Sequence, residues 1–156
     1  MPKSLVASVE LTNAMTFRAS TASGHELVMD ASPDVGGTES GARPMELLMA
    51  GLGGCTGMDV ISILRKKRQE VTGYEVRVQG IRAESHPMIF EDITIEHIIT
   101  GHHLQHEAVR RAIALSEARY CGAGAMLGRV AQLRHMYCIV EVEMPETSDL
   151  PARVPA

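Results

Sequence analysis

Two of the three cysteines, Cys55 and Cys121, lie in glycine-rich segments where a thiol could act as a nucleophile. Cys55 stands in the stretch RPMELLMAGLGGCTGMDVISIL (43–64), and Cys121 stands in SEARYCGAGAML (116–127), where we expect one helix to end and a short one to begin. Unpaired N–H groups at a helix end or an opened turn stabilise a thiolate and lower the pKa of a thiol. The alternative is an inert thiol, because free cysteine is among the most buried residue types.

The segment around Cys55 reads as an apolar helix, yet it holds four glycines within seven residues, namely Gly51, Gly53, Gly54 and Gly57. Each glycine inside a helix costs about 0.5–1 kcal/mol relative to alanine. Two explanations stay open. The glycines allow another part of the backbone to approach closely, or they kink the helix at Cys55 and leave room for a substrate.

The third cysteine and the histidines carry weaker signals. Cys138 alternates with apolar residues in HMYCIVEVEM (135–144), which predicts a buried position on a strand. His102 and His106 have the spacing of one helix face, but no glutamate lies between them as in the H-E-x-x-H zinc motif, so we expect no metal site. For the histidines that are scattered elsewhere we expect structural or exposed positions: His25, His86, His97 and His135.

Apolar periodicity predicts the elements that position these residues. Short apolar or alternating runs at 4–11, 14–20 and 25–31 predict an antiparallel meander. Period-two runs at 73–85 and 88–100 predict a long hairpin, and 132–144 predicts a final strand. Helical spacing predicts a helix from Pro44 to the basic run RKKR (65–68), with Glu46 in its first turn, and a second helix at 104–120. The order βββ–α–ββ–α–β groups the strands in runs, which indicates an α+β fold.

Composition narrows the class of protein. The 156 residues have a net charge of −4 and only 3% aromatic residues, which argues against a nucleic-acid-binding surface. The first residues lack the apolar run of a signal peptide, and Asp59 interrupts the longest apolar segment, so we expect a cytoplasmic protein with no membrane span. We expect one domain over residues 1–144 and a loosely held tail over 145–156.

The two cysteine segments together resemble the OsmC/Ohr family, the osmotically inducible and organic hydroperoxide resistance proteins, and most closely its YhfA-type branch. In that branch the first motif runs like P-M-E-x-x-L-x-A-x-G-G-C-x-x-x-D-V-x-S-I-L, and the second contains L-S-x-x-x-Y-C. Residues 44–64 and 115–121 are similar to these patterns, and the likeness extends over residues 5–143.

This resemblance implies an OsmC-like α+β fold in which antiparallel sheets wrap two central helices and two chains intertwine as a homodimer. It also implies thiol-dependent reduction of organic hydroperoxides without cofactor or metal. Cys55 matches the peroxidatic cysteine, Cys121 matches the resolving cysteine, and Glu46 matches a glutamate that organises the thiolate. An arginine of the first hairpin pairs with that thiolate in the family. Arg18 lies near its place, and Arg43 is the other candidate.

The implied substrate is an organic hydroperoxide, and the implied reductant is an external dithiol. We expect methionines to line an apolar pocket for the substrate, namely Met45, Met49, Met58 and Met126. In the Ohr pattern a proline follows the second cysteine, whereas here Gly122 follows Cys121. Two alternatives stay open: a non-catalytic module that binds a small hydrophobic molecule, and a thiol redox sensor.

Overall fold

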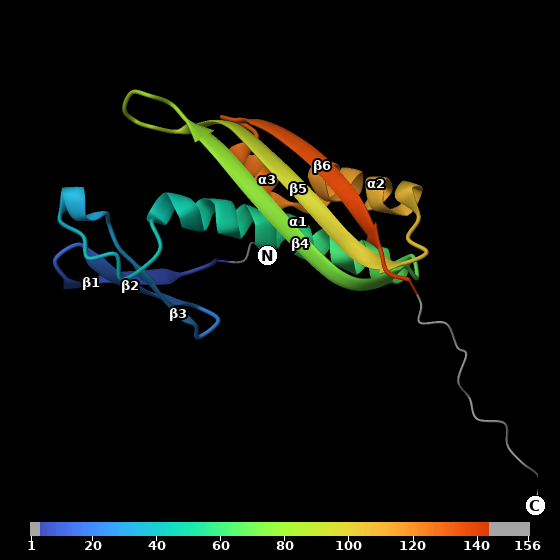
Figure 1. Ribbon diagram of the computed structural model, residues 1–156. Helices are drawn as coiled ribbons and strands as arrows, with labels where there is room; N and C mark the ends of the chain where they lie inside the picture. The colour runs from blue at the N-terminus through green and yellow to red at the C-terminus, as the bar shows by residue number, and fades with distance from the viewer. Residues whose placement is uncertain (1–3, 144–156) are drawn as a thin grey trace, which may run out of the picture. The chain divides into compact units, whose positions relative to one another are not determined.

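The computed structural model describes residues 4–143, which form an N-terminal unit up to Gly51 and a second unit from Leu52 onward. Along the chain the elements are β1 (Ala7–Asn13), β2 (Thr16–Thr21), β3 (Glu26–Met29), the 3₁₀ turn η1 (Pro33–Val35), α1 (Pro44–Lys66), β4 (Glu70–Arg82), β5 (Phe90–His102), α2 (His106–Leu115), the π-helical turn η2 (Ser116–Tyr120), α3 (Gly122–Leu127) and β6 (Gln132–Glu141) (Figure 1). That residues 1–144 form one domain stays a prediction, and the predicted tail over 145–156 lies outside the described residues.

The N-terminal unit is built on an antiparallel sheet of order β1-β2-β3, as predicted. Asp30 directly follows β3, and its carboxylate is buried. It accepts hydrogen bonds from the backbone N–H groups of Ala31, Thr38 and Ser40 and from the hydroxyls of Thr38 and Ser40. These hydrogen bonds hold the pKa of Asp30 well below its usual range, and the bond from the Ser40 N–H has the largest effect. Burial acts in the opposite direction and raises this pKa. Asp30 therefore fixes the loop that leads to α1.

Helix α1 begins at Pro44, where the sequence predicts its start. The Glu46 carboxylate accepts a hydrogen bond of 2.9 Å from the backbone N–H of Arg43, one residue before the helix. A carboxylate at this position satisfies an unpaired donor and interacts favourably with the helix dipole. By length and apolar composition α1 could span a membrane, a property that core helices of soluble proteins share.

Helix α1 continues unbroken through Cys55, which rules out a kink at this residue, one of the two explanations left open by the sequence. Two of its glycines face β4 closely. A Cβ atom at Gly53 would lie 3.1 Å from Cγ2 of Val78, and one at Gly57 would lie 3.3 Å from Cγ2 of Val76. Close packing against a strand, rather than an opened turn, therefore accounts for Gly53 and Gly57.

The sheet of the second unit has the order β4-β5-β6, and α1, α2 and α3 lie on one of its faces (Figure 1). Strands β4 and β5 form the predicted antiparallel hairpin, in which Tyr74 pairs with Ile99. Strand β6, in contrast, lies parallel to β5. The reason is the connection: the chain leaves β5, crosses over through α2, η2 and α3, and returns to the sheet in the same direction.

Alternation along the strands decides which side chains form the core. In β5 every second residue is fully buried against the helices, in the series Ile93, Ile95, His97 and Ile99. Val60 and Leu64 of α1 and Val109 of α2 pack in one core with Ile99. In β6 the alternation places Cys138 on the opposite, exposed face, so the prediction that this cysteine is buried is wrong.

Candidate active site

The structure brings Cys55 of α1 and Cys121, the residue before α3, together. Their sulfur atoms and a carboxylate oxygen of Asp59 all lie within 4.8 Å of one another. Cys55 is half-buried, and the residue Cys121 is 4% exposed. A disulfide bond is about 2 Å long, so the two sulfurs would have to move closer together to form one. The pairing that the resemblance implies stays a prediction, and the proximity of the two sulfurs supports it.

A π-helical turn positions Cys121. Within the predicted helix over 104–120, the α-helical part ends at Leu115. In η2 each hydrogen bond reaches five residues back instead of four, and the N–H of Cys121 donates to the carbonyl of Ser116 at 2.8 Å. Such turns are rare and frequently lie at functional sites. The Cys121 sulfur then accepts a hydrogen bond of 3.2 Å from the N–H of Gly124.

Burial has the largest effect on the pKa of Cys121. It raises the pKa of this thiol to about 11, although the N–H of Gly124 favours the thiolate. The nearby Cys55 and Asp59 raise the pKa further. Of the two alternatives left open by the sequence, a thiol with a lowered pKa is therefore wrong and the buried thiol is confirmed for Cys121, because one N–H donor does not offset the loss of water around the sulfur. At neutral pH Cys121 is a protonated thiol.

A hydrogen-bonded network holds Asp59 beside the thiols. The Ser116 hydroxyl donates to Oδ2 of Asp59 at 3.0 Å, and it lies 3.1 Å from the hydroxyl of Thr56. Thr56 and Ser116 are both fully buried. Asp59 was not a predicted site residue, although it follows Cys55 by four positions and so shares its helix face.

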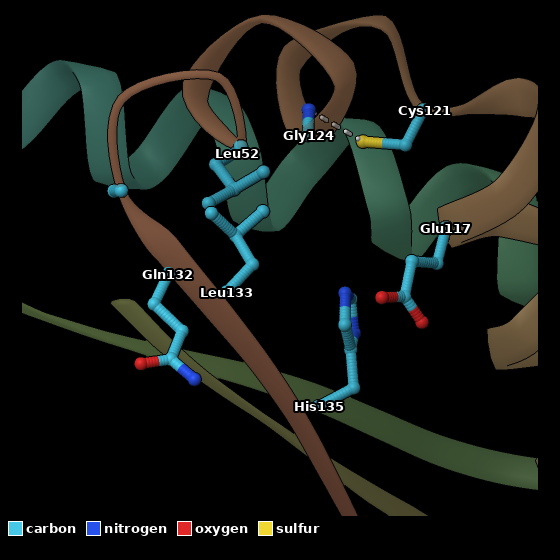
Figure 2. A pocket seen from close by; sticks show the side chains of 9 residues that line it. Leu52, Glu117, Cys121, Gly124, Gln132, Leu133 and His135 are labelled. Carbon is cyan, nitrogen blue, oxygen red and sulfur yellow. Dashed lines mark hydrogen bonds between the residues drawn. The ribbon is translucent and has the colours of Figure 1, made fainter. Parts of the chain in front are cut away.

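A cavity of about 290 Å³ opens beside Cys121. Its lining comprises Leu52, Glu117, Cys121, Gly124, Gly128, Ala131, Gln132, Leu133 and His135 (Figure 2). Cys55 is not part of this lining, and neither are the four methionines expected to line a substrate pocket. Met58 and Met126 are instead 74% and 70% exposed. A second cavity, of about 390 Å³, reaches Asp59 and is bordered by Lys66, Lys67 and Tyr120.

A chain of three hydrogen-bonded side chains ends at the first cavity. The hydroxyl of Tyr74 lies 2.6 Å from Nδ1 of His97, and Nε2 of His97 lies 3.0 Å from Nδ1 of His135. Burial lowers the pKa of His97 to about 4, and His135 contributes in the same direction. Burial also lowers the pKa of His135, while Glu117 opposes this shift. Both imidazoles are therefore neutral at pH 7.

His97 has the structural position that the sequence predicts, whereas His135 also borders the cavity. The alternation of residues along β5 and β6 could have indicated that these two histidines lie close together. His97 continues the buried series of β5, and His135 lies directly opposite Ile95 on β6, on the face that meets the helices. An imidazole in an otherwise apolar buried series needs polar partners, which Tyr74 and His135 supply.

The other predicted site residues lie in the N-terminal unit. Arg18 is exposed on β2. The guanidinium of Arg43 pairs with the carboxylate of Glu39 at 3.0 Å, and Glu46 caps the start of α1. Their roles toward the thiolate of Cys55 stay predictions.

The donor set of the site also suits one class of metal ion. Two thiolates and a carboxylate within 4.8 Å of one another are the ligand types that zinc and cadmium prefer. The sequence led us to expect no metal site. The three donors could nonetheless hold such an ion when both thiols are reduced.

The model of the OsmC-like protein family matches residues 37–136. The chain belongs to the OsmC-like family. This OsmC-like chain is 37% identical to protein YhfA of Escherichia coli (strain K12) over 134 residues, which are 86% of this chain and 97% of YhfA. The family and the α+β fold predicted from the sequence are thereby confirmed.

Solved structures share the OsmC-like fold. A hypothetical protein from Aquifex aeolicus VF5 superposes with a TM-score of 0.81 at 32% identity, covering 91% of this chain and all (100%) of that chain. An organic hydroperoxide resistance protein OsmC from Legionella pneumophila superposes with a TM-score of 0.66 at 13% identity, covering 86% of this chain and 96% of that chain.

Proposed function

We propose that this OsmC-like protein reduces organic hydroperoxides in defence against oxidative stress, with Cys55 as the attacking thiol and Cys121 as the resolving thiol. The observation that carries the proposal is the proximity of the two sulfurs, which lie within 4.8 Å of each other although Cys55 lies in α1 and Cys121 directly precedes α3. The described function of the Legionella neighbour, organic hydroperoxide resistance, supports the same chemistry.

The proposed reaction uses each cysteine once. The thiolate of Cys55 attacks one peroxide oxygen, the O–O bond breaks, an alcohol leaves, and Cys55 becomes a sulfenic acid. The thiol of Cys121 then condenses with this sulfenic acid, and the Cys121 proton leaves with the hydroxyl group as water. The high pKa of Cys121 suits this second role, since it keeps Cys121 from competing for the peroxide. An external dithiol reduces the disulfide.

The proposal includes a cation and a carboxylate for the first step. Arg18 is our candidate to pair with the thiolate of Cys55, and Arg43 is the second candidate. A guanidinium beside the sulfur would lower its pKa and stabilise the alkoxide that leaves. Glu46, which already caps α1, would help to organise the thiolate.

We propose that the protein acts as a homodimer, in which a second copy covers α1. Only 28% of the most apolar window of this helix is buried within the chain. Met58 and Leu48 of α1 are 74% and 46% exposed. Apolar helix faces of this kind are typical of protein interfaces.

Turnover of cumene hydroperoxide with dithiothreitol tests the proposed function. We expect repeated turnover in the wild type and in Cys138→Ser, no turnover in Cys55→Ser, and strongly reduced turnover in Cys121→Ser. Circular dichroism of each variant checks that it is folded. Unchanged turnover in Cys55→Ser would contradict the proposal. Consumption of only one equivalent of hydroperoxide per chain would indicate a redox sensor. Binding of a small hydrophobic molecule without turnover would indicate a binding module.

A further inference from the structure

The cavity beside Cys121 gives access to one sulfur of the pair and not to the other. Cys121 borders it, whereas Cys55 does not. One part of its wall is apolar, with Leu52 and Leu133, and another part carries Glu117 and His135. In Figure 2 the Glu117 carboxylate lies beside the His135 ring, and both face the same space as Cys121. A volume of about 290 Å³ suits a small organic molecule.

We propose that this cavity admits the reducing thiol, which gives its proton to His135 and attacks Sγ of Cys121 in the Cys55–Cys121 disulfide. The inference rests on the proposed function, because that function forms this disulfide. His135 is then a catalytic residue of the reductive half of the cycle, and the side from which the reductant arrives determines which cysteine is attacked.

The proposed step balances as a thiol–disulfide exchange. The S–H bond of the incoming thiol breaks, its proton passes to His135, and its sulfur forms a new S–S bond with Cys121. The Cys55–Cys121 bond breaks at the same time, and Cys55 leaves as a thiolate. The second thiol of the same reductant then attacks the reductant's own sulfur in the mixed disulfide and loses its proton to solvent. A disulfide forms within the reductant, the bond to Cys121 breaks, and Cys121 takes up the proton held by His135 and leaves as a thiol. Attack at Cys121 therefore releases Cys55 directly in the ionisation state that the next peroxide requires.

Geometry determines where the proton goes on His135. Nδ1 of His135 is engaged with Nε2 of His97, so Nε2 of His135 is the nitrogen that is left to accept a proton. In the accepting state, Nδ1–H of His135 donates to His97, and Nδ1–H of His97 donates to the oxygen of Tyr74. Among residues 4–143, His97 of β5 is hydrogen-bonded to His135, and the titratable groups that line the cavity with His135 are Glu117 of η2 and Cys121.

Two of these neighbours, His97 and Glu117, favour a role as base for His135. His97 stays neutral, because burial lowers its pKa to about 4, so it does not add a second charge when His135 is protonated. The Glu117 carboxylate stabilises the imidazolium that forms, consistent with its upward effect on the pKa of His135. His135 would thus act as a general base whose position is fixed by His97 and whose protonated form is stabilised by Glu117.

The rate of disulfide reduction tests the role of His135 independently of peroxide chemistry. The Cys55–Cys121 disulfide is made with diamide in the Cys138→Ser background, and its reduction by 2-mercaptoethanol is followed over pH. His135→Asn places an amide where Nδ1 lies, so it keeps a partner for His97 but removes Nε2. We expect it to slow reduction at neutral pH by about tenfold or more, and Glu117→Gln to slow it less. His103→Asn, at an exposed histidine, is the matched control and should not change the rate.

The pH dependence separates catalysis from a structural role. The slowing in His135→Asn should shrink as the pH approaches the pKa of the added thiol, because an ionised thiol needs no base. Equal slowing at every pH, or no slowing at all, would overturn the role of His135.

The site of attack is read from the trapped intermediate. Acid quenching of the reaction, followed by peptide mapping, should find 2-mercaptoethanol on Cys121 and Cys55 as the free thiol. An adduct found mainly on Cys55 would overturn the inference. If peroxide turnover is absent but the diamide-made disulfide shows the His135 dependence, the peroxidase proposal fails and the reduction route stands. If turnover is present without that dependence, the reverse holds.

Discussion

Ser116 donates a hydrogen bond of 3.0 Å to Asp59, and this bond joins the two segments that carry Cys55 and Cys121. Asp59 follows Cys55 by one helical turn on α1, and Ser116 begins the π-helical turn that directly precedes Cys121. The buried hydroxyl of Thr56 completes the network at 3.1 Å. The carboxylate is therefore held beside the thiols, where its charge raises the pKa of Cys121.

Removal of that charge should make Cys121 more acidic. In a background of Cys55→Ser and Cys138→Ser, we expect Asp59→Asn to lower the pKa of Cys121 by up to about one unit. The pKa should remain above that of a free thiol, since burial is the larger cause. The pH dependence of alkylation by iodoacetamide measures it. Ser116→Ala, which keeps the charge, is the control, and an unchanged or higher pKa in Asp59→Asn would contradict the arrangement.

The three donors should bind one thiophilic ion per chain. We expect cadmium to produce thiolate charge-transfer absorption at one equivalent and to protect both thiols from alkylation. Cys55→Ser and Cys121→Ser should abolish this absorption, and Asp59→Asn should weaken binding about tenfold. Cys138→Ser should leave it unchanged, because Cys138 is exposed on the other face of the sheet. Binding that survives in Cys55→Ser would show that the sulfurs are not neighbours.

A charge on the exposed face of α1 should weaken the proposed homodimer. Met58 is 74% exposed, and Met58→Glu would place a carboxylate in the interface that we propose. We expect the dimer dissociation constant to rise by at least about tenfold, or 1.4 kcal/mol. Analytical ultracentrifugation measures it, with Met136→Glu on the outer face of the sheet as the control. Equal dissociation constants for the two variants would argue against a dimer built on α1.

Asp30 should make the protein sensitive to acid. Its pKa is lower in the folded chain than in the unfolded chain, so it stabilises the fold above the unfolded value of about 4, and this stabilisation is lost as the pH falls toward the folded value. Asp30→Asn should lower the melting temperature at pH 7 and reduce its dependence on pH in the acid range. Melting curves between pH 7 and pH 3 test this. Asp34→Asn, in η1 of the same loop, is the control. Identical pH dependence in Asp30→Asn and the wild type would rule out this role.

Local chemistry made much of the fold predictable. Proline at the first helical position and a glutamate two residues later mark the start of α1 at Pro44. Period-two alternation marks β4 and β5, whose observed bounds differ from the predicted ones by two or three residues. These features depend on neighbours along the chain, so the sequence contains them.

What the sequence did not predict depends on tertiary contacts. Alternation identifies two faces of β6 but not which one the helices cover, and so Cys138 was placed on the wrong face. The pKa of Cys121 depends on the loss of water around its sulfur, which no local motif reports. The chain of Tyr74, His97 and His135 forms only when β4, β5 and β6 align in register.

The disulfide formed after a single equivalent of cumene hydroperoxide tests the central claim most directly. Peptide mapping by mass spectrometry, after alkylation of the remaining thiols, identifies the oxidised cysteines. We predict a disulfide between Cys55 and Cys121 within one chain, with Cys138 recovered as the alkylated thiol. Recovery of Cys55 and Cys121 as free thiols, or a disulfide that includes Cys138, would contradict the two-cysteine mechanism.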